Sequence, residues 1–439
     1  MNGINKILRG DKVIWVVALL LGIISLIVVY SASSALVFKN YGGNTGRLLM
    51  KHSGTLLIGF VMMFVAYKID YRRFAKFAWF LLIPCLALLL YTLLFGKHIN
   101  AASRTINLFG ISFQPSEIAK IILITYLARQ LVMMGDRLGN FKDVILYLGL
   151  PTLLTAALIF PENLSTAAIL LVVCMVLLFI GRVKFLHILA IVGIGIVGMG
   201  LYIAFDAIKT NVGNRRAEKA NIEIVANGGE ARPYIPKQNR IQTWSNRISA
   251  MGESKEEGFD PFDDHHYQQT YAKIAVATGS VFGKGPGKSE QRNFLPHPYS
   301  DFIYAIIIEE YGIIGAIIVL LLYIILFTRV VRIVHKRPLT FGSLMAFGLG
   351  FIVIMQAMIN MGVSIGLLPV TGQPLPFVSM GGSSMMATGF ILGMILSVTR
   401  NIETEEEENQ QEQLEEEPGQ ETITEEIQDT DESEPENRD

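Results

Sequence analysis

Apolar segments long enough to cross a lipid bilayer make up most of this chain. A helix needs about 20 predominantly apolar residues to span the hydrocarbon layer. Ten segments meet or approach this length, at residues 13–31, 54–69, 76–95, 115–133, 144–160, 164–181, 185–205, 302–328, 341–366 and 380–399. Only 17% of the 439 residues are charged, against about 25% in soluble domains. We therefore predict an all-α polytopic membrane protein with about ten transmembrane helices, and we exclude a cytosolic enzyme, a nucleic-acid-binding protein and a disulfide-stapled secreted module.

Basic residues predict the orientation of these helices. Lys and Arg gather before the first helix and in every second connection, at Lys6, Arg9 and Lys12, at Lys68, Arg72, Arg73 and Lys76, at Arg129, Arg137 and Lys142, at Arg182 and Lys184, and at Arg329, Arg332, Lys336 and Arg337. Cytoplasmic connections are enriched in Lys and Arg. Both termini are therefore predicted to be cytoplasmic. The long connection at 206–300, between the seventh and eighth helices, is predicted to be extracytoplasmic.

A strongly acidic tail follows the membrane domain, which we expect to occupy residues 1–400. Residues 401–439 contain 18 acidic residues and one basic residue, a net charge of −17, which leaves the membrane domain at +16. Such a tail has almost no apolar side chains to bury, so we predict that it is disordered and cytoplasmic. The two cysteines, Cys85 and Cys174, lie in apolar segments and indicate no disulfide framework.

Ionisable residues at membrane depth are the first functional candidates, because burying a charge in lipid is costly. Glu117 and Lys120 lie three positions apart, on one face of a helix that Pro115 is well suited to begin. They are either a structural ion pair or the lining of a polar cleft, with Lys120 facing an anionic ligand. Arg104, in the preceding connection, is either an interfacial anchor or a phosphate ligand, a role that suits a guanidinium group.

Asp301 ends the long connection and directly precedes an apolar run. Prolines at 296 and 298 make the approach rigid and hold the carboxylate at the membrane boundary. Asp301 is either a helix N-cap or a half-buried carboxylate suited to act as a general base. Glu309 and Glu310 lie about two turns deeper in the same helix. Packing alone does not explain two adjacent carboxylates there, so we expect one of them to pair with Arg or Lys.

Two segments only look like ligand sites. Residues 283–289 resemble a phosphate-binding loop, but the Walker pattern requires glycine where Phe282 stands. Its backbone N–H groups, with Lys284 or Lys288, remain suited to a phosphate. Residues 263–266 read Asp-Asp-His-His, yet four consecutive side chains do not readily converge on one ion. We therefore expect a solvated turn there and no dedicated metal site.

The last connection, residues 368–384, carries no charge and is dense in Pro, Gly and Ser. Such backbone cannot complete helical hydrogen bonds, and at membrane depth it is tolerated only inside protein or along a cavity. The small residues at its end should permit close helix packing. We expect this connection to contribute the structural and cavity-lining residues Gln373, Pro374, Pro376, Ser379, Gly381, Gly382 and Ser383.

Three motifs in order resemble those of the SEDS family (shape, elongation, division and sporulation), which includes the FtsW, RodA and SpoVE proteins. Residues 371–384 are close to the family signature G-x-P-L-P-F-V-S-x-G-G-S-S, residues 113–120 match F-Q-P-S-E-x-x-K, and residues 294–303 match F-L-P…D-F-I, with Glu309 and Glu310 as its acidic pair. The resemblance covers about 400 residues. Residues 161–166 depart from the family's P-D-x-G-T element, and Met380 replaces its usual Tyr.

The resemblance implies a peptidoglycan glycosyltransferase that polymerises lipid II at the outer face of the cytoplasmic membrane. Asp301 matches the family's catalytic acid and would act as general base on the acceptor 4-hydroxyl in an inverting displacement. Positive charge would stabilise the departing diphosphate. Residues expected at the lipid II and diphosphate site are Arg104, Glu117, Lys120, Lys284, Lys288 and Arg292. We expect no cofactor, apart from a divalent cation such as Mg²⁺ held loosely on the diphosphate.

The resemblance also implies a partner and a location. Family members act with a class B penicillin-binding protein, an FtsI-type transpeptidase, and with other divisome proteins. The acidic tail and residues 283–287 are more similar to the division branch, FtsW, than to the elongation branch, RodA, which predicts an inner-membrane protein at the division septum. An elongation-type polymerase, a lipid II flippase and a non-catalytic scaffold are the alternatives. Transport would require a polar route reaching both faces, whereas the ionisable residues cluster toward the outer helix ends.

Overall fold

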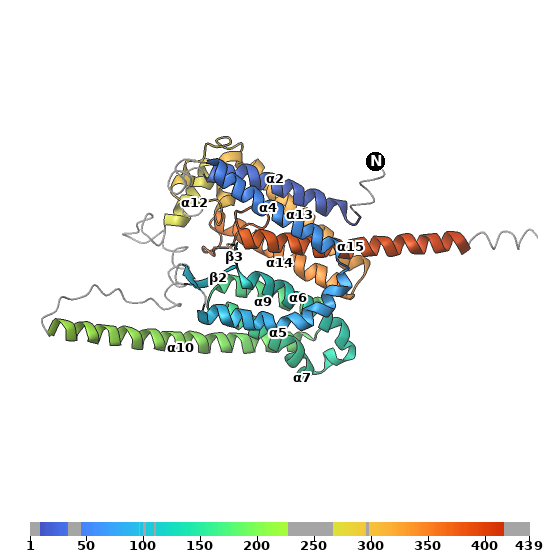
Figure 1. Ribbon diagram of the computed structural model, residues 1–439, viewed down its shortest axis with the longest axis horizontal. Coiled ribbons are helices and arrows are strands. Elements are labelled where there is room, and N and C mark those ends of the chain that lie inside the picture. Colours follow the sequence, from blue (N-terminus) through green and yellow to red (C-terminus); the bar gives the residue numbers. More distant parts are fainter. Residues whose placement is uncertain are drawn as a thin grey trace, which may run out of the picture.

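Ten apolar helices run side by side through the computed structural model (Figure 1). The structure describes residues 9–33, 45–95, 97–99, 102–108, 111–226, 267–295 and 298–416. Within these ranges, nine helical segments are long and apolar enough to span a membrane, and Leu164–Ile180 is a shorter apolar helix. The predicted helical, polytopic membrane fold is therefore confirmed, with nine candidate spans and one shorter apolar helix among the described residues.

The helices follow the predicted apolar segments closely. Their bounds are α2 Lys12–Ala32, α4 Thr45–Lys68, α5 Tyr71–Phe95, α6 Pro115–Met134, α7 Phe141–Val144 continuing through the π-helical turn η2 Ile145–Gly149 into α8 Leu150–Ile159, α9 Leu164–Ile180, α10 Phe185–Ala226, α13 Ile303–Lys336, α14 Phe341–Ser364 and α15 Gly382–Glu416. Shorter elements are the 3₁₀ turns η1 Gly135–Gly139 and η3 Gln291–Asn293 and the helix α12 Tyr267–Thr278.

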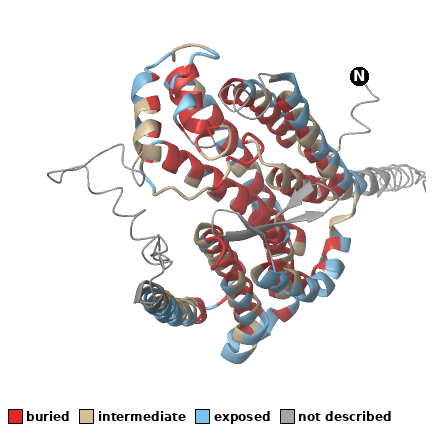
Figure 2. Cartoon of the chain, turned by 60° about the vertical axis from the view of Figure 1, so that its left-hand side comes forward, coloured by how far each residue is buried: buried red, intermediate tan, exposed pale blue. Residues whose placement is uncertain are grey.

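Burial varies strongly among the helices. The segments of α14, α15 and α6 are the most buried, whereas α10 is the least buried. Figure 2 shows the buried residues gathered toward the middle of the bundle. Large apolar side chains lie exposed on the outer helices, for example at Phe80, Ile83 and Leu186. In a bilayer these side chains face lipid. Their exposure is therefore not unfavourable, as it would be in water. The bundle therefore has a polar-containing centre and an apolar perimeter.

The close packing of α15 occurs deeper than the sequence suggested. A Cβ atom added at Gly389 would lie 2.1 Å from the carbonyl oxygen of Gly59 in α4, and one at Gly393 would lie 2.2 Å from that of Met63. At Gly382, by contrast, an added Cβ would meet nothing within 4 Å. The close helix packing expected at the start of α15 is therefore not present at Gly382. The two backbones converge two to three turns further along α15.

A small antiparallel sheet lies in the connection between α5 and α6, where the sequence predicted only a loop. The strands β1 Lys97–Ile99, β2 Ala102–Leu108 and β3 Ile111–Phe113 pair in the order β1-β2-β3. β3 leads directly into α6, which begins with Pro115 at its first turn and has Gln114 at its N-cap without a side-chain hydrogen bond. The sheet thus fixes the approach to the helix that carries Glu117 and Lys120.

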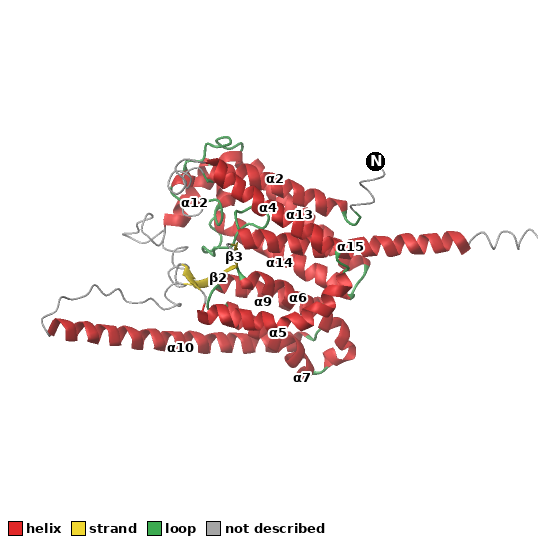
Figure 3. Cartoon of the chain, in the orientation of Figure 1, coloured by secondary structure: helices red, strands yellow, loops and turns green. Residues whose placement is uncertain are grey.

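α10 and α15 extend furthest beyond the segments predicted for them (Figure 3). α10 continues to Ala226, well into the connection predicted from residue 206. α15 continues to Glu416, so our prediction of disorder from residue 401 is wrong for the first part of the acidic tail. The predicted order of the segment from 268 to 300 is present in α12 and η3. The predictions for Pro296, for residues 263–266 and for the tail from 417 to 439 lie outside the described residues.

The acidic extension of α15 is held by basic residues from three other parts of the chain. Glu405 Oε1 and Oε2 lie 2.8 Å and 3.1 Å from the guanidinium groups of Arg72 and Arg337. Further pairs are Lys336 with Glu406 at 3.0 Å and Arg9 with Glu407 at 3.6 Å. We call this set of ion pairs the acidic clasp. It brings the N-terminal segment, the start of α5 and the end of α13 to one end of the bundle.

Candidate active site

Asp301 lies in the turn before α13, at the end of the bundle opposite the acidic clasp. The helix N-cap is the next residue, Phe302, and no side chain makes a capping hydrogen bond there. The Asp301 carboxylate instead accepts a hydrogen bond from the Ser300 hydroxyl, with Oγ and Oδ1 2.9 Å apart. Of the two roles that the sequence left open, the structure therefore does not support the N-cap.

The segment 371–381, which we call the signature loop, enters the protein as non-helical backbone. Its central residues are buried, and internal bonds shape it, since the Leu375 N–H donates to Ser379 Oγ at 2.7 Å. The Tyr323 hydroxyl of α13 donates to the Pro376 carbonyl. Phe377 has φ 64°, a strained conformation for a bulky residue that persists only where the surroundings enforce it. The predicted buried, non-helical role of this segment agrees with the structure.

Hydrogen bonds join the signature loop to the Asp301 turn. Ser379 Oγ donates to the Ser300 carbonyl at 2.6 Å, and the Met380 N–H donates to the Tyr299 carbonyl at 2.9 Å. A methyl group at Gly372 would lie 3.7 Å from Asp301 Oδ2, so the carboxylate itself reaches the loop. The two segments that carry the most specific sequence motifs thus form one site.

Asn360 of α14 links the same two segments from a third side. Its Nδ2 donates to the carbonyl oxygens of Asp301 at 2.9 Å and Gln373 at 2.8 Å. The side chain is fully buried. Asn360 was not a candidate from the sequence, although an amide inside the apolar span 341–366 is a signal of a functional position.

The hairpin between α8 and α9 also contacts the signature loop. Gln373 Nε2 donates to Thr166 Oγ1 at 2.9 Å and lies 3.4 Å from Asn163 Oδ1. Asn163 is at the same time the N-cap of α9, with its side chain accepting from the Thr166 N–H. The segment 161–166, which departs from the family pattern, therefore still takes part in the site.

An apolar cavity begins beside this hairpin. It has a volume of about 230 Å³ and lies between α8, α9 and α10. Ala167, Ala168 and Leu171 line it from α9, and Gly195 and Gly198 line it from α10. Ala167 directly follows Thr166, so the cavity opens next to the residue that binds Gln373.

Glu117 and Lys120 form the predicted ion pair in α6. Lys120 Nζ lies 2.8 Å from Glu117 Oε1, and their side chains are 1% and 8% exposed. Such burial of an ammonium group is costly unless its charge is compensated. This is a well-formed internal pair; whether Lys120 also binds an anionic ligand stays a prediction. Arg104 lies in β2, and the structure does not describe its side chain.

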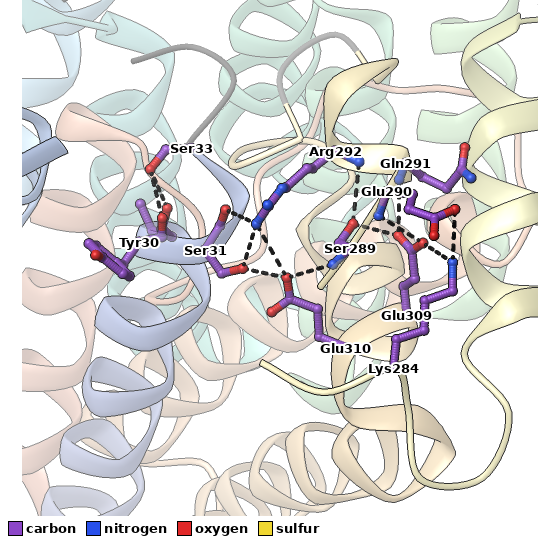
Figure 4. Close-up of polar contacts among 11 residues, drawn as sticks. Tyr30, Ser31, Ser33, Lys284, Ser289, Glu290, Gln291, Arg292, Glu309 and Glu310 are labelled. Atoms are coloured by element: carbon purple, nitrogen blue, oxygen red, sulfur yellow. Dashed lines mark hydrogen bonds and ion pairs between the residues drawn. The ribbon is translucent and has the colours of Figure 1, made fainter. Parts of the chain in front are cut away.

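Glu309 and Glu310 bind the segment 284–292, as Figure 4 shows. Lys284 Nζ lies 2.9 Å from Glu309 Oε1, which also accepts from the Glu290 N–H at 3.1 Å. The Ser289 hydroxyl and the Gln291 N–H donate to Glu309 Oε2. Both glutamates are fully buried. The expectation that one of the pair meets a basic residue agrees with this arrangement.

Glu310 faces a different set of partners in the same cluster. It accepts from the Ser31 hydroxyl and, at 3.3 Å, from the Ser289 N–H, and Arg292 Nη1 lies 3.9 Å away. The same guanidinium group donates to the Ser31 carbonyl at 3.0 Å. α2 is thereby tied to both α13 and the loop.

Backbone amides suited to a phosphate are thus used by the protein itself. The Lys284 and Gly285 N–H groups donate to the Glu309 and Glu310 carbonyls, each at 2.9 Å. The hydrogen bond to Glu309 raises the pKa of the Lys284 ammonium group above its ordinary value. Lys284 and Arg292 remain predicted diphosphate ligands, but the structure gives each a carboxylate partner. Lys288 is exposed.

Metal-binding groups are not apparent in the described part of the chain. Among those residues, no three His, Cys, Asp or Glu side chains gather closely enough to hold an ion. The expectation of a loosely held cation on the substrate concerns a ligand of the diphosphate and stays a prediction.

Sequence comparisons find relatives over nearly the whole chain. A family model named FTSW_RODA_SPOVE and described as "Cell cycle protein" matches residues 11–404. A Geobacter sulfurreducens protein named "Probable peptidoglycan glycosyltransferase FtsW" is 31% identical over 404 residues, covering 91% of this chain and 97% of that protein. "Stage V sporulation protein E" of Bacillus subtilis is 30% identical, covering 89% of this chain and 97% of that protein.

Solved structures share the fold. A chain from "Structural coordination of polymerization and crosslinking by a peptidoglycan synthase complex" aligns with a TM-score of 0.63 at 24% identity, covering 89% of this chain and 98% of that chain. The rod shape determining protein RodA of Thermus thermophilus aligns with a TM-score of 0.58 at 24% identity, covering 89% of this chain and 97% of that chain. The helix arrangement described above therefore recurs in proteins of known structure.

Proposed function

The chain belongs to the FtsW/RodA/SpoVE family of cell cycle proteins, and on that premise we propose that it is a peptidoglycan glycosyltransferase that polymerises lipid II. The family membership confirms the resemblance that the three sequence motifs indicated. The chain is a multi-pass membrane protein. The proposal assigns its chemistry to the site formed by Asp301, the signature loop and the α8–α9 hairpin.

The observation that carries the proposal is the placement of the Asp301 carboxylate. It lies at a helix end without capping that helix, and hydrogen bonds fix the backbone on both sides of it. An inverting displacement requires one positioned base on the attacking hydroxyl. We assign to Asp301 the removal of the proton from the acceptor 4-hydroxyl as that oxygen attacks the anomeric carbon. The carbon's bond to the lipid diphosphate breaks as the new bond forms, and the diphosphate leaves with the electron pair.

The remainder of the substrate needs an apolar and a cationic environment. The cavity between α8, α9 and α10 suits part of a lipid chain, and it begins next to Thr166, which binds Gln373 of the signature loop. We assign the binding of the departing diphosphate to Lys120, with Arg104 as a second ligand. A guanidinium group offers two parallel N–H donors to phosphate oxygens.

We further propose that the Asp301 end of the bundle is extracytoplasmic and that the acidic clasp is cytoplasmic. Arg9, Arg72 and Arg337 gather at the clasp, as the enrichment of basic residues on cytoplasmic connections requires. The partner would be a class B penicillin-binding protein of the FtsI type, and the site of action the division septum. The complex named in the structural comparison couples polymerization to crosslinking, which supports a transpeptidase partner.

Polymerisation of labelled lipid II in liposomes tests the proposal. The purified protein with its transpeptidase partner should produce a ladder of glycan strands, with moenomycin present to silence contaminating classical glycosyltransferases. Asp301→Asn keeps the shape and the hydrogen bond from Ser300 but removes the base, so it should lose turnover by about 100-fold or more. The matched control is Asp136→Asn, an exposed carboxylate of η1, which should retain wild-type activity.

Each remaining outcome rejects a defined part of the proposal. Ladders from Asp301→Asn at the wild-type rate would remove Asp301 from the role of base while keeping the polymerase. An absence of ladders from wild type with bound partner would reject the polymerase itself, and lipid II transport across the bilayer would be measured next.

A further inference from the structure

Two fully buried polar side chains, Ser25 in α2 and His52 in α4, are linked to the signature loop, which Ser25 contacts directly and His52 reaches through Ser25. Ser25 Oγ lies 2.7 Å from the Val378 carbonyl oxygen and 2.8 Å from His52 Nε2. Ser25 and His52 have no exposed surface. Neither residue was a candidate from the sequence, and the reaction proposed above does not use them. An ionisable side chain inside an apolar span nevertheless requires an explanation.

The hydrogen-bond partners determine which nitrogen of His52 carries a proton at this contact. A carbonyl oxygen only accepts, so the single hydroxyl proton of Ser25 is directed at Val378. Ser25 Oγ must then accept from His52, and the Nε2 atom is therefore protonated. His52 Nδ1 has no hydrogen-bond partner among the described residues. The result is a directed chain in which His52 donates to Ser25 and Ser25 donates to the loop.

The Val378 carbonyl occupies a sensitive place in the signature loop. It follows Phe377, whose φ of 64° requires support from its surroundings. It precedes Ser379, whose hydroxyl donates to the Ser300 carbonyl, and Met380, whose N–H donates to the Tyr299 carbonyl. A displacement of Val378 is therefore passed on, over one or two residues, to the turn that holds Asp301.

We propose that His52 and Ser25 are positioning residues that fix the place of the Asp301 carboxylate through the signature loop. The proposal rests on the proposed function, because it concerns the geometry of that same site. Without the Ser25 hydroxyl, the buried Val378 carbonyl loses its partner, and the Val378–Ser379 peptide is free to rotate and to displace Ser379. Without His52, the Ser25 hydroxyl is no longer held in one orientation.

The kinetic test uses removal, rescue and a matched control. Ser25→Ala and His52→Leu should each lower kcat for lipid II polymerisation by about 10-fold to 100-fold, because a reacting group displaced by about 1 Å costs about that much. KM should change by less than about twofold, since no substrate contact is removed. His52→Gln retains an N–H donor near the position of Nε2 and should recover most of kcat. Thr92→Val is the control, because its buried hydroxyl bonds only carbonyls of its own helix.

The double variant tests whether the two residues act as one chain. Ser25→Ala combined with His52→Leu should be no slower than the slower single variant, since both changes break the same connection. Effects that multiply would contradict the proposal. So would single variants that lower the thermal unfolding midpoint without changing kcat, because that result describes packing alone.

A measurement without turnover separates this proposal from the proposed function. The chain has seven histidines, so ¹⁵N-histidine labelling gives few signals, and the one that disappears in His52→Gln belongs to His52. That signal should report a proton on Nε2 and none on Nδ1, and it should shift in Ser25→Ala but not in Thr92→Val. A signal with the proton on Nδ1 would overturn the hydrogen-bond chain even if wild type polymerises lipid II. If the hydrogen bonds of His52 and Ser25 are intact but the wild-type protein makes no glycan, the proposed function is rejected. The positioning role then fails because there is no reaction for it to serve.

Discussion

The Lys284 ammonium group lies 2.9 Å from Glu309 Oε1 and joins the connection before α13 to the turn that precedes the kink of that helix at Gly312. The carboxylate is fully buried, and three further donors from residues 289–291 surround it. A carboxylate so placed organises the loop, as a bound anion would. The sequence of this loop resembles a phosphate-binding loop. In the structure, the Glu309 carboxylate takes the place that a phosphate would have.

Replacing Glu309 by Gln should destabilise the protein by about 1–3 kcal/mol, because buried N–H and hydroxyl donors lose a charged acceptor. Thermal unfolding in detergent measures the change. Glu290→Gln is the control, since that side chain is largely exposed and lies 3.4 Å from the same ammonium group. Equal stability of Glu309→Gln and wild type would mean that the cluster does not hold the loop.

The same pair should give a pH dependence. The pKa of Lys284 is raised in the folded protein, so its contribution to stability is complete below the ordinary lysine pKa and is lost as the pH rises through the raised value. The stability advantage of wild type over Glu309→Gln should therefore decrease only at strongly alkaline pH, and only by the part that Lys284 contributes. A difference that disappears already near neutral pH would contradict the assignment.

Gly283 and Gly287 provide a matched pair in one loop. Both have positive φ, 79° and 75°, but a Cβ at Gly283 would lie 2.2 Å from the Glu310 carbonyl oxygen, whereas nothing lies within 4 Å at Gly287. Gly287→Ala should cost about 1–2 kcal/mol, the conformational term alone. Gly283→Ala should cost clearly more, because backbone cannot yield as a side chain does. Unfolding midpoints of the two variants measure this, and equal midpoints would count against the close approach of loop and helix.

The contact between α15 and α4 should be equally sensitive to position. Gly389→Ala would place a methyl group 2.1 Å from the Gly59 carbonyl oxygen, whereas Gly382→Ala meets no neighbour. We expect Gly389→Ala to lower the yield of folded protein sharply and Gly382→Ala to leave it unchanged. Size-exclusion profiles in detergent measure both. A normal profile for Gly389→Ala would show that the two helices can separate without loss of the fold.

The acidic clasp should weaken with salt. Its ion pairs are largely exposed at the surface, and each is worth about 0–1 kcal/mol and is screened at high ionic strength. Cleavage by a glutamate-specific protease within residues 403–408 should therefore be faster at about 1 M salt than at about 0.1 M. Arg337→Gln and Arg72→Gln together should raise the rate at low salt to the high-salt value, while Arg332→Gln, which takes no part in the described pairs, should not.

Much of the fold could be predicted because a membrane-spanning helix appears in the sequence as one continuous apolar segment of about 20 residues. The ten segments and the pairing of Glu117 with Lys120 follow from length, apolarity and helical spacing. The extent of α10 and α15 could not be predicted in this way, because a helix that leaves the bilayer loses its apolar signature. α15 continues beyond residue 401 where Glu405 meets Arg72 and Arg337, partners more than 60 residues away in the sequence.

The site was predicted only as far as its motifs extend. Asp301 is recognisable in the sequence as a carboxylate at the membrane boundary, and the signature loop as a segment rich in Pro, Gly and Ser. Their contact, however, depends on how α13 and α14 cross. Asn360, Thr166 and Ser25 make ordinary hydrogen bonds, and the sequence does not show which residues are their partners. Lys284 and Arg292 were chosen for their charge alone, and sequence could not show that two glutamates of the next helix face them.

α15 is one continuous helix of 35 residues, about 52 Å long at 1.5 Å per residue. It starts where the signature loop ends, locks against α4 at Gly389 and Gly393, and reaches the acidic clasp with its far part. A rigid element carries a push or a twist from one end to the other. One helix thus connects the signature loop, which shapes the Asp301 site, with the acidic clasp at the opposite end of the bundle. A force on the acidic end is therefore transmitted to the signature loop, and the close contacts of Gly389 and Gly393 with α4 form the pivot.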